Sequence, residues 1–323
     1  MKTIHWAMIG TGDVTEKKSG PGFYKAKNSV LYGVTNRTLA KAEDYAKRHH
    51  VEKVFASVDD LLADPKVDAV YIATPPGSHK DYALRCAEAG KVCYIEKPIA
   101  LTYNEALEIS EAFKKANVKA FVAYYRRTLP RFTEVKVLLD AGTIGDVRFV
   151  NVAYYRPAAK DEINGTHWHV QPEISGGGIF MDMAVHTLDI LYFFFGAIEK
   201  VAAFSVNQAG YYAPEDNVAL SFAFDNHITG TGNWCFTTDT VADNIQIVGS
   251  KGEINFGCFT NDPIQLKTAE QETAIPAGTI EHVHQNLIQT IVDELNGQGS
   301  CPSTIESALR TAWVCDQVYQ QQD

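Results

Sequence analysis

Short apolar segments alternate with helical segments through the first 123 residues, and this alternation restricts the folds that the chain can adopt. Strands that alternate with helices form a parallel sheet with helices on both faces. The expected strands are residues 4–9, 30–34, 53–55, 69–73, 92–96 and 119–123, and the expected helices are residues 40–49, 58–63, 79–89 and 103–116. Because ligands of such sheets bind at the carboxyl ends of the strands, functional residues are expected there.

A glycine-containing turn follows the first expected strand. It consists of Gly10, Thr11, Gly12, Asp13 and Val14. In a Rossmann unit this position brings backbone N–H groups to the pyrophosphate of a dinucleotide. Thr15 stands where the pattern has its third glycine, so the motif is incomplete. Since tight glycine turns also follow strands that bind no nucleotide, the turn alone does not decide between the two interpretations.

The end of the second expected strand bears on the choice of dinucleotide. A Rossmann unit that binds NAD has an acidic residue here, which binds the adenosine ribose and repels a 2′-phosphate. This chain has Asn36 and Arg37 instead, followed by Lys41. A guanidinium favours the 2′-phosphate of NADP through charge-assisted hydrogen bonds. The alternative is a solvated arginine that opens a surface helix.

Two further strand ends carry chemically distinctive residues. The fourth strand is followed by Thr74, Pro75, Pro76 and His79. The fifth is followed by Glu96, Lys97 and Pro98. The first set gives a rigid apolar loop suited to a nicotinamide ring, and the second holds Lys97 at the carboxyl edge of the sheet. A surface ion pair, which contributes little to stability, is the alternative for Glu96 and Lys97.

From residue 147 the strands alternate apolar and polar residues and are joined by short turns, which indicates an antiparallel sheet. The expected strands are residues 147–155, 201–206, 218–224, 228–236, 245–248, 253–256 and 264–267, and helices at 283–295 and 304–320 follow. Ser303 is the expected N-cap of the last helix, with Glu306 three residues later. We expect a Rossmann domain at 1–123 and a second α/β domain at 124–323, whose last helix can pack back on the first.

One face of this second sheet has no helices left to cover it. Its alternate positions are expected to carry apolar and aromatic residues. Because exposed apolar sheet faces usually mark interfaces, we expect a homo-oligomer, either a dimer or a tetramer, assembled through this sheet.

A helix expected between the strands at 147–155 and 201–206 carries an acid and a histidine one turn apart. Asp182 and His186 follow three glycines and share one face of an otherwise apolar helix. Such a pair calls for a partner, which is either a reacting substrate or the hydrogen-bonding groups of a protein core. The preceding loop contains Tyr155 and Trp168, whose aromatic faces suit a sugar ring, although ordinary surface loops have the same composition.

Composition excludes several classes of function. The net charge of −10 leaves no basic surplus for a nucleic-acid partner, and no apolar run reaches the ~20 residues that span a bilayer. The six cysteines form no CxxC pattern, which is typical of reduced thiols in the cytoplasm. His167 and His169 alternate as on opposite faces of a strand, so no metal site is expected. We expect a cytoplasmic protein without a membrane or nucleic-acid partner.

The ordered set of motifs resembles the Gfo/Idh/MocA family of oxidoreductases, which includes glucose–fructose oxidoreductase and inositol dehydrogenase. The resemblance is carried by Gly10 and Gly12, Thr74-Pro75-Pro76 with His79, Glu96-Lys97-Pro98, Tyr125-Arg126-Arg127, Gly176-Gly177-Gly178 with Asp182 and His186, and Gly249-Ser250-Lys251-Gly252. It implies a Rossmann domain followed by an α/β domain with a large open, predominantly antiparallel sheet. It also implies NAD(P)-dependent oxidation or reduction of a sugar, polyol or related cyclic alcohol.

By analogy with the family, Lys97 and His186 are catalytic and Asp182 is the partner of the histidine. Arg126 lies at the expected domain junction, within reach of either ligand, and is assigned to the cofactor. Hydride transfer at an alcohol carbon requires that the hydroxyl proton be removed or returned, and an imidazole titrating near ~6.5 is suited to carry it. Lys97 then hydrogen-bonds the reacting oxygen or relays the proton.

The expected substrate contacts are Lys97, Tyr155, Trp168, Asp182 and His186, and the glycines before Asp182 are expected to let its helix approach the nicotinamide closely. Two alternatives stay open. One is a non-catalytic NAD(P)-binding sensor, because fold alone does not fix function. The other is a reductase or dehydrogenase for a non-sugar substrate such as a dihydrodiol.

Overall fold

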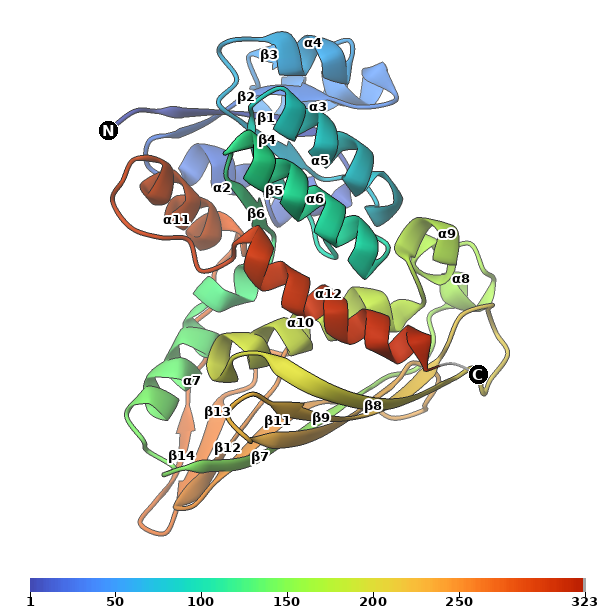
Figure 1. Ribbon diagram of the computed structural model, residues 1–323, viewed down its shortest axis with the longest axis vertical. Helices are drawn as coiled ribbons and strands as arrows, with labels where there is room; N and C mark the ends of the chain where they lie inside the picture. The colour runs from blue at the N-terminus through green and yellow to red at the C-terminus, as the bar shows by residue number, and fades with distance from the viewer. Residues whose placement is uncertain (322–323) are drawn as a thin grey trace. The chain divides into compact units, whose positions relative to one another are not determined.

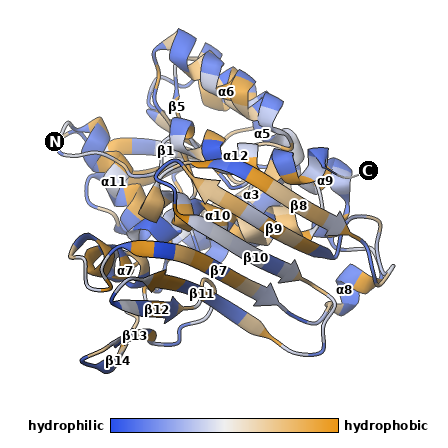
Figure 2. Ribbon diagram, turned by 60° about the horizontal axis from the view of Figure 1, so that its bottom comes forward, coloured by the Kyte–Doolittle hydropathy of each residue, from blue (hydrophilic) through white to orange (hydrophobic). Residues whose placement is uncertain are grey.

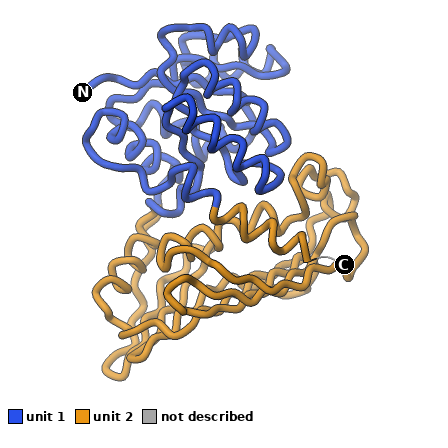
Figure 3. The backbone as a smooth tube through the Cα atoms, viewed as in Figure 1, with its two compact units in different colours: residues 1–128, 280–309 blue, residues 129–279, 310–323 orange. Residues whose placement is uncertain are grey.

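The computed structural model describes residues 1–321, which form two compact units. Unit 1 contains residues 1–128 and 280–309, and unit 2 contains residues 129–279 and the chain from residue 310 onward (Figure 3). A segment near the C-terminus therefore completes the N-terminal unit. The last helix, α12 (Ile305–Gln320), begins in unit 1 and continues in unit 2.

Unit 1 is built on a parallel sheet of six strands in the order β3-β2-β1-β4-β5-β6. The strands are β1 (Ile4–Ile9), β2 (Ser29–Thr35), β3 (Lys53–Val54), β4 (Ala69–Ile72), β5 (Val92–Ile95) and β6 (Ala120–Val122). The helices of unit 1 are α1 (Asp13–Lys17), α2 (Gly20–Lys25), α3 (Leu39–His49), α4 (Val58–Ala63), α5 (His79–Glu88), α6 (Tyr103–Ala116) and α11 (Gln285–Leu295), with short 3₁₀ turns η1 (Pro76–Ser78) and η2 (Tyr125–Thr128). This strand order is that of a Rossmann sheet, which confirms the expected fold.

Local sequence signals explain the sharpest boundaries in unit 1. The hydroxyl of Ser57 accepts a hydrogen bond from the Asp60 N–H at the start of α4, and Thr102 does the same for Glu105 at the start of α6. Between the sheet and α2, Trp6, Phe23 and other aromatic side chains are fully buried and pack ring against ring. Burial of this kind supplies most of the stabilisation of such a domain.

Unit 2 is built on an eight-stranded sheet in the order β14-β13-β12-β11-β7-β10-β9-β8. The strands are β7 (Val147–Tyr155), β8 (Ile198–Val206), β9 (Asn217–Phe224), β10 (Thr229–Cys235), β11 (Ala242–Gly249), β12 (Gly252–Phe256), β13 (Ile264–Thr268) and β14 (Glu272–Ile275). Neighbours pair antiparallel except β7 and β10, which are parallel. The expected predominantly antiparallel sheet is confirmed.

Helices cover one face of this sheet and leave the other open (Figure 1). The covering helices are α7 (Pro130–Asp140), α10 (Ile179–Phe195) and the unit 2 part of α12; the shorter helices are α8 (Lys160–Ile163), α9 (Pro172–Ser175) and the 3₁₀ turn η3 (Trp168–Val170). The aromatic side chains of β9 and β10, such as Phe222 and Trp234, are buried on the covered side. The apolar positions of the alternating strands therefore form the core beneath the helices.

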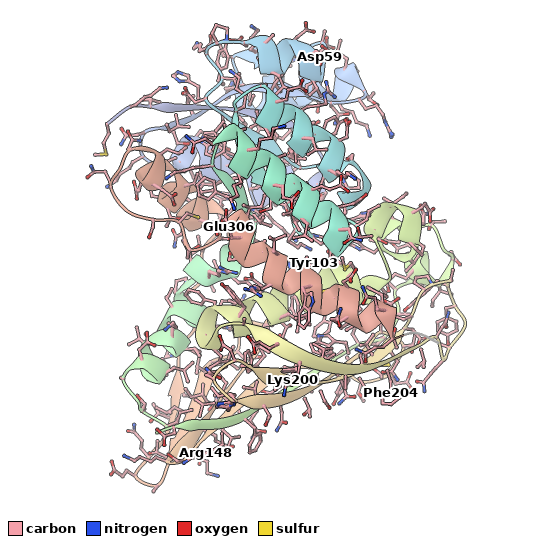
Figure 4. All side chains as sticks on the ribbon, viewed as in Figure 1. Asp59, Tyr103, Arg148, Lys200, Phe204 and Glu306 are labelled. Atoms are coloured by element: carbon pink, nitrogen blue, oxygen red, sulfur yellow. The ribbon has the colours of Figure 1, made fainter. Side chains whose placement is uncertain are left out.

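The composition of the open face differs from the sequence expectation. Alternation sends the aromatic residues inward, so the outward positions of β9 and β10 hold mainly small and polar residues such as Ser221 and Thr231 (Figure 2). For β9 and β10, the expectation of alternating apolar and aromatic residues on this face was wrong. Exposed apolar side chains occur on β7, where Phe149 is 39% exposed, and on β8, where Phe204 is 78% exposed, while Lys200 of β8 is charged (Figure 4).

Several other elements were not expected from the sequence. Helices α2 and α7 and the exposed edge strand β14 are additional. The N-cap of α12 is Thr304 and not Ser303, because the Thr304 hydroxyl accepts from the Ser307 N–H at 3.3 Å whereas the Ser303 hydroxyl donates to the Val122 carbonyl at 2.7 Å. The residues at 167–169 form a 3₁₀ turn and not a strand.

One stretch, Pro172–Phe195, is long and apolar enough to cross a membrane by length and composition alone. It comprises α9 and α10, which are separated by Gly176 at a φ of 85°. Since 72% of its apolar window is buried inside the fold, we assign it as the core helix of unit 2.

Candidate functional site

The turn after β1 has the backbone geometry that the glycines predict. Gly10 has a φ of 95°, and a Cβ there would lie 2.9 Å from the carbonyl oxygen of Ala73 at the end of β4. A Cβ on Gly12 would meet nothing within 4 Å, so the backbone at the start of α1 is accessible. Asp13 is exposed, while Thr11 and Val14 are partly buried. The turn therefore offers an open approach to its backbone.

Thr15 replaces the third glycine of the motif without disturbing the turn. Its side chain is fully buried, and its hydroxyl donates to the Gly12 carbonyl at 2.7 Å. The Thr15 carbonyl in turn accepts from the Tyr45 hydroxyl at 3.0 Å. The threonine thus stabilises the glycine turn from below, and its side chain does not project over the accessible backbone at Gly12.

The end of β2 lies beside the glycine turn. The Asn36 amide donates to the Thr11 hydroxyl at 2.9 Å, and its oxygen accepts from the Thr38 N–H at the start of α3 at 2.9 Å. Arg37 is exposed. Asn36 therefore connects the two segments expected to bind a dinucleotide, and a guanidinium, not a carboxylate, follows it.

The side chain of His79 connects the segments that follow β4 and β5. The His79 ring is fully buried, with Nε2 2.7 Å from the Thr74 carbonyl and Nδ1 2.9 Å from the Pro98 carbonyl. Burial lowers the pKa of His79, although the two carbonyls act in the opposite direction. His79 therefore connects the loop that contains Pro75 and Pro76 with the segment that contains Lys97.

Glu96 is part of a buried polar cluster beneath Lys97. Burial raises the pKa of the Glu96 carboxyl, which accepts a hydrogen bond from the Tyr71 hydroxyl and one from the Lys97 N–H at 3.2 Å. His284, at the start of α11, lies 3.7 Å from Glu96 and is hydrogen-bonded to the Tyr94 hydroxyl at 2.8 Å. Burial lowers the pKa of His284 to about 3. The cluster fixes the backbone from which the Lys97 side chain extends.

Arg126 lies in the 3₁₀ turn η2 of unit 1 and is buried. Its guanidinium donates to the Tyr125 hydroxyl at 2.9 Å and lies 5.0 Å from the centre of that ring. The cation is therefore held by its aromatic neighbour in the same turn.

In unit 2, Asp182 and His186 lie one turn apart on α10. Gly178 is the N-cap of this helix, and its N–H donates to the Glu215 carboxyl at 3.0 Å, as does the Tyr319 hydroxyl at 2.8 Å. A Cβ on Gly178 would lie 2.6 Å from Glu215, and one on Gly177 would overlap the Tyr319 hydroxyl. The close approach that requires these glycines is therefore to Glu215 and Tyr319.

Two aromatic groups flank the acid–histidine pair. Nε2 of His169 lies 3.6 Å from an Asp182 carboxylate oxygen, and the Trp168 ring packs on His169 with ring centres 3.7 Å apart. His186 is 5% exposed, and the Phe259 ring meets it edge to face at 6.0 Å. Trp168 therefore contacts His169, which in turn lies beside Asp182. Tyr155, at the end of β7, is partly buried.

Within residues 1–321, no cluster of three His, Cys, Asp or Glu side chains is arranged to hold a metal ion. The rings of His167 and His169 are 4.5 Å apart in the 3₁₀ turn, so the two histidines are not on opposite faces.

Comparison with known proteins identifies the family. Residues 4–124 match the oxidoreductase family with an NAD-binding Rossmann fold, and residues 132–255 match the GFO/IDH/MocA C-terminal domain. The chain belongs to the GFO/IDH/MocA oxidoreductase family. The expectations of a two-domain family fold and of an NAD(P)-dependent oxidoreductase are confirmed.

Three similar proteins illustrate the range of this GFO/IDH/MocA family. Oxidoreductase P35 of Formosa agariphila is 37% identical over 97% of both chains. The scyllo-inositol 2-dehydrogenase (NAD(+)) of Bacillus subtilis is 29% identical over 83% of this chain and 78% of that protein. The fold of a levoglucosan dehydrogenase, solved with NADH and levoglucosan, superposes with a TM-score of 0.84 at 22% identity, over 98% of this chain and 96% of that one.

Sequence reasoning missed several residues around the family's motifs. Glu215 and Tyr319 support the start of α10, Phe259 contacts His186, and His284 completes the cluster at Glu96. Each lies far along the chain from the group that it contacts, so no local spacing marks it. Glu215 lies at the N-terminus of α10, where the helix dipole favours an acid, but this preference becomes visible only when the fold is known.

Proposed function

We propose that this oxidoreductase prefers NADP and transfers a hydride to or from a sugar, polyol or related cyclic alcohol. The observation that carries the substrate class is the Asp182–His186 pair on one face of α10, because alcohol oxidation needs a group that accepts the hydroxyl proton. The names of the similar inositol and levoglucosan dehydrogenases support the same class.

The residues of unit 1 fit a dinucleotide. Gly10 allows a tight turn in which a Cβ would meet the Ala73 carbonyl, and Gly12 leaves its backbone accessible. A dinucleotide-binding turn needs both features, the first for the turn and the second for the approach of the pyrophosphate. The residues that would hold the cofactor lie at the glycine turn, at Asn36 and Arg37, at Thr74 to Pro76 and at Arg126. When bound, the nicotinamide supplies or accepts the hydride. Arg37 supports NADP, since its charge complements a 2′-phosphate.

The remaining chemistry belongs to side chains of this chain. We assign His186 to accept the hydroxyl proton during oxidation and to return it during reduction. Asp182 orients the imidazole and stabilises its protonated form, and Lys97 donates a hydrogen bond to the reacting oxygen and favours its alkoxide-like form. Tyr155 and Trp168 are proposed to contact the substrate.

The cofactor part is tested by titrating the wild-type protein and Arg37→Gln with NADPH and NADH. The expected result is tighter NADPH binding in the wild type and a loss of about tenfold or more for NADPH alone in the variant. Lys47→Gln, which removes an exposed cation from α3, is the matched control and should bind like the wild type. Preference for NADH in the wild type would contradict the role given to Arg37.

The oligomer belongs to the same proposal. We propose that a second copy of this chain packs against the open face of β7, β10, β9 and β8. This face has a shallow concavity. The exposed Phe204 at its edge supports an apolar contact. Sedimentation analysis should show a dimer or larger species, and Phe204→Glu should shift it towards the monomer; a monomeric wild type would refute this part.

A further inference from the structure

The loop between β12 and β13, residues 257–263, carries an aromatic ring to His186. The Phe259 ring is partly buried and meets the His186 ring edge to face, with centres 6.0 Å apart and planes at 76°. On another side it packs against Tyr154 of β7 at 4.7 Å. An aromatic surface is therefore built directly beside the group that we assign to proton transfer.

Two charged side chains hold this loop through its backbone. The Asp243 carboxylate accepts from the N–H groups of Cys258, Phe259 and Thr260 at 2.8, 2.6 and 2.7 Å. The buried Arg131 guanidinium donates to the carbonyls of Gly257 at 2.8 Å and Asp262 at 2.7 Å, and also to that of Thr260. Hydrogen bonds to ionised groups are the strong ones, so the loop is fixed.

Glycine is required where the loop begins. A Cβ on Gly257 would lie 2.7 Å from an Asp243 carboxylate oxygen, so a larger residue would displace the acid that holds the next three N–H groups. The loop is thus clamped from β11 through Asp243 and from α7 through Arg131. Such a clamp fixes the position of Phe259 before any ligand arrives, which lowers the entropy lost on binding.

Burial distinguishes Phe259 from a core aromatic. Phe256, three residues earlier, is 3% exposed and packs into the core of unit 2, whereas Phe259 is only partly buried. A rigidly held, partly exposed ring beside a proton carrier is a surface on which the C–H face of a ring-shaped substrate can stack. An open-chain polyol has no such flat face.

We propose that Phe259 is a specificity-determining residue, whose ring contacts the substrate beside His186 and favours cyclic alcohols over open-chain polyols. Asp243 and Arg131 are its positioning residues. The inference rests on the proposed function, because it takes His186 to be the proton carrier.

The first test compares Phe259→Leu, Phe259→Tyr and the wild type with a cyclic polyol, myo-inositol, and an open-chain polyol, sorbitol. KM is measured, or the inhibition constant for a probe that does not turn over. Phe259→Leu should raise the KM or inhibition constant for myo-inositol by about five- to tenfold and leave that for sorbitol unchanged. Phe259→Tyr keeps the ring and should restore the wild-type ratio. Equal changes for both probes, or none, would overturn the proposal.

The second test addresses the clamp without turnover. Hydrogen exchange of the amides at 257–262 should accelerate by about tenfold or more in Asp243→Asn. In the matched control Asp239→Asn, an exposed acid four residues away, exchange should stay as in the wild type. Asp243→Asn should also raise the KM or inhibition constant for myo-inositol, as Phe259→Leu does. Faster exchange with an unchanged constant for myo-inositol would refute the positioning role of Asp243.

Loss of the proposed function and loss of the role of Phe259 would give different experimental results. If the wild type binds neither NADPH nor NADH, the proposed function fails, whatever Phe259 does. If the wild type binds the cofactor and turns over a ring substrate while Phe259→Leu keeps the wild-type ratio, only the role of Phe259 fails.

Discussion

Replacing Glu215 by glutamine should make the stability of unit 2 less dependent on pH. The Glu215 carboxyl is 6% exposed and accepts hydrogen bonds from the Gly178 N–H and the Tyr319 hydroxyl. Burial raises its pKa from an ordinary 4.5 to about 7, with the neighbouring Asp216 adding to the effect. Glutamine keeps an oxygen that accepts both hydrogen bonds but carries no charge at any pH.

The sign and size of the effect follow from the two pKa values. Because the folded protein binds this proton more tightly than the unfolded chain does, the associated stability is fully present below the unfolded pKa of 4.5. It is lost as the pH rises through about 7. At 1.36 kcal/mol per pH unit, the total is about 3 kcal/mol, of which about 2–3 kcal/mol falls between pH 5 and pH 8.

Urea unfolding followed by tryptophan fluorescence measures this at pH 5 and pH 8, since Trp234 is fully buried in unit 2. The free energy of unfolding of Glu215→Gln minus that of the wild type should be about 2–3 kcal/mol larger at pH 8 than at pH 5, because the variant does not lose stability as the pH rises. Glu199→Gln, an exposed acid of β8, is the matched control and should show no such difference. A relative stability of Glu215→Gln that is the same at both pH values would refute the reasoning.

Two further variants test unit 1. Gly10→Ala should lower the free energy of unfolding by about 1–3 kcal/mol and weaken NADPH binding, because a Cβ at a φ of 95° also approaches the Ala73 carbonyl to 2.9 Å; thermal unfolding and a binding titration check both effects. Tyr71→Phe removes a donor to the buried Glu96 carboxyl and should cost about 1–3 kcal/mol in urea unfolding, and an unchanged midpoint would count against the buried cluster.

The elements that could be predicted from the sequence are those with strong local signals. Helices α4 and α6 begin where Ser57 and Thr102 cap them, and β7 has a regular alternation over nine residues. Helix α2 contains two glycines and a proline, and the exposed residues of β14 show no alternation, so neither was detected. The cap at Thr304 was missed because Ser303 fits the same motif and is used elsewhere by Val122.

The candidate site divides in the same way. Gly10, Lys97, Asp182 and His186 lie at strand ends or at helical spacing, so their patterns are local. The contacts of Glu215 with Gly178 and of Phe259 with His186 join positions 37 and 73 residues apart. Such pairs depend on sheet order and on which face each strand turns inward, which hydrophobic periodicity does not specify.

We propose that Lys97 and His186 carry out proton chemistry during nicotinamide-dependent oxidation of a cyclic alcohol. It is tested most directly by following reduced-nicotinamide absorbance with a panel of sugars, polyols and cyclic diols, using the wild type, Lys97→Met and His186→Asn. We expect turnover of at least one ring alcohol by the wild type, a loss of about 100-fold or more in kcat in each variant, and cofactor affinity close to that of the wild type. Full activity in either variant on a substrate that the wild type turns over would contradict it.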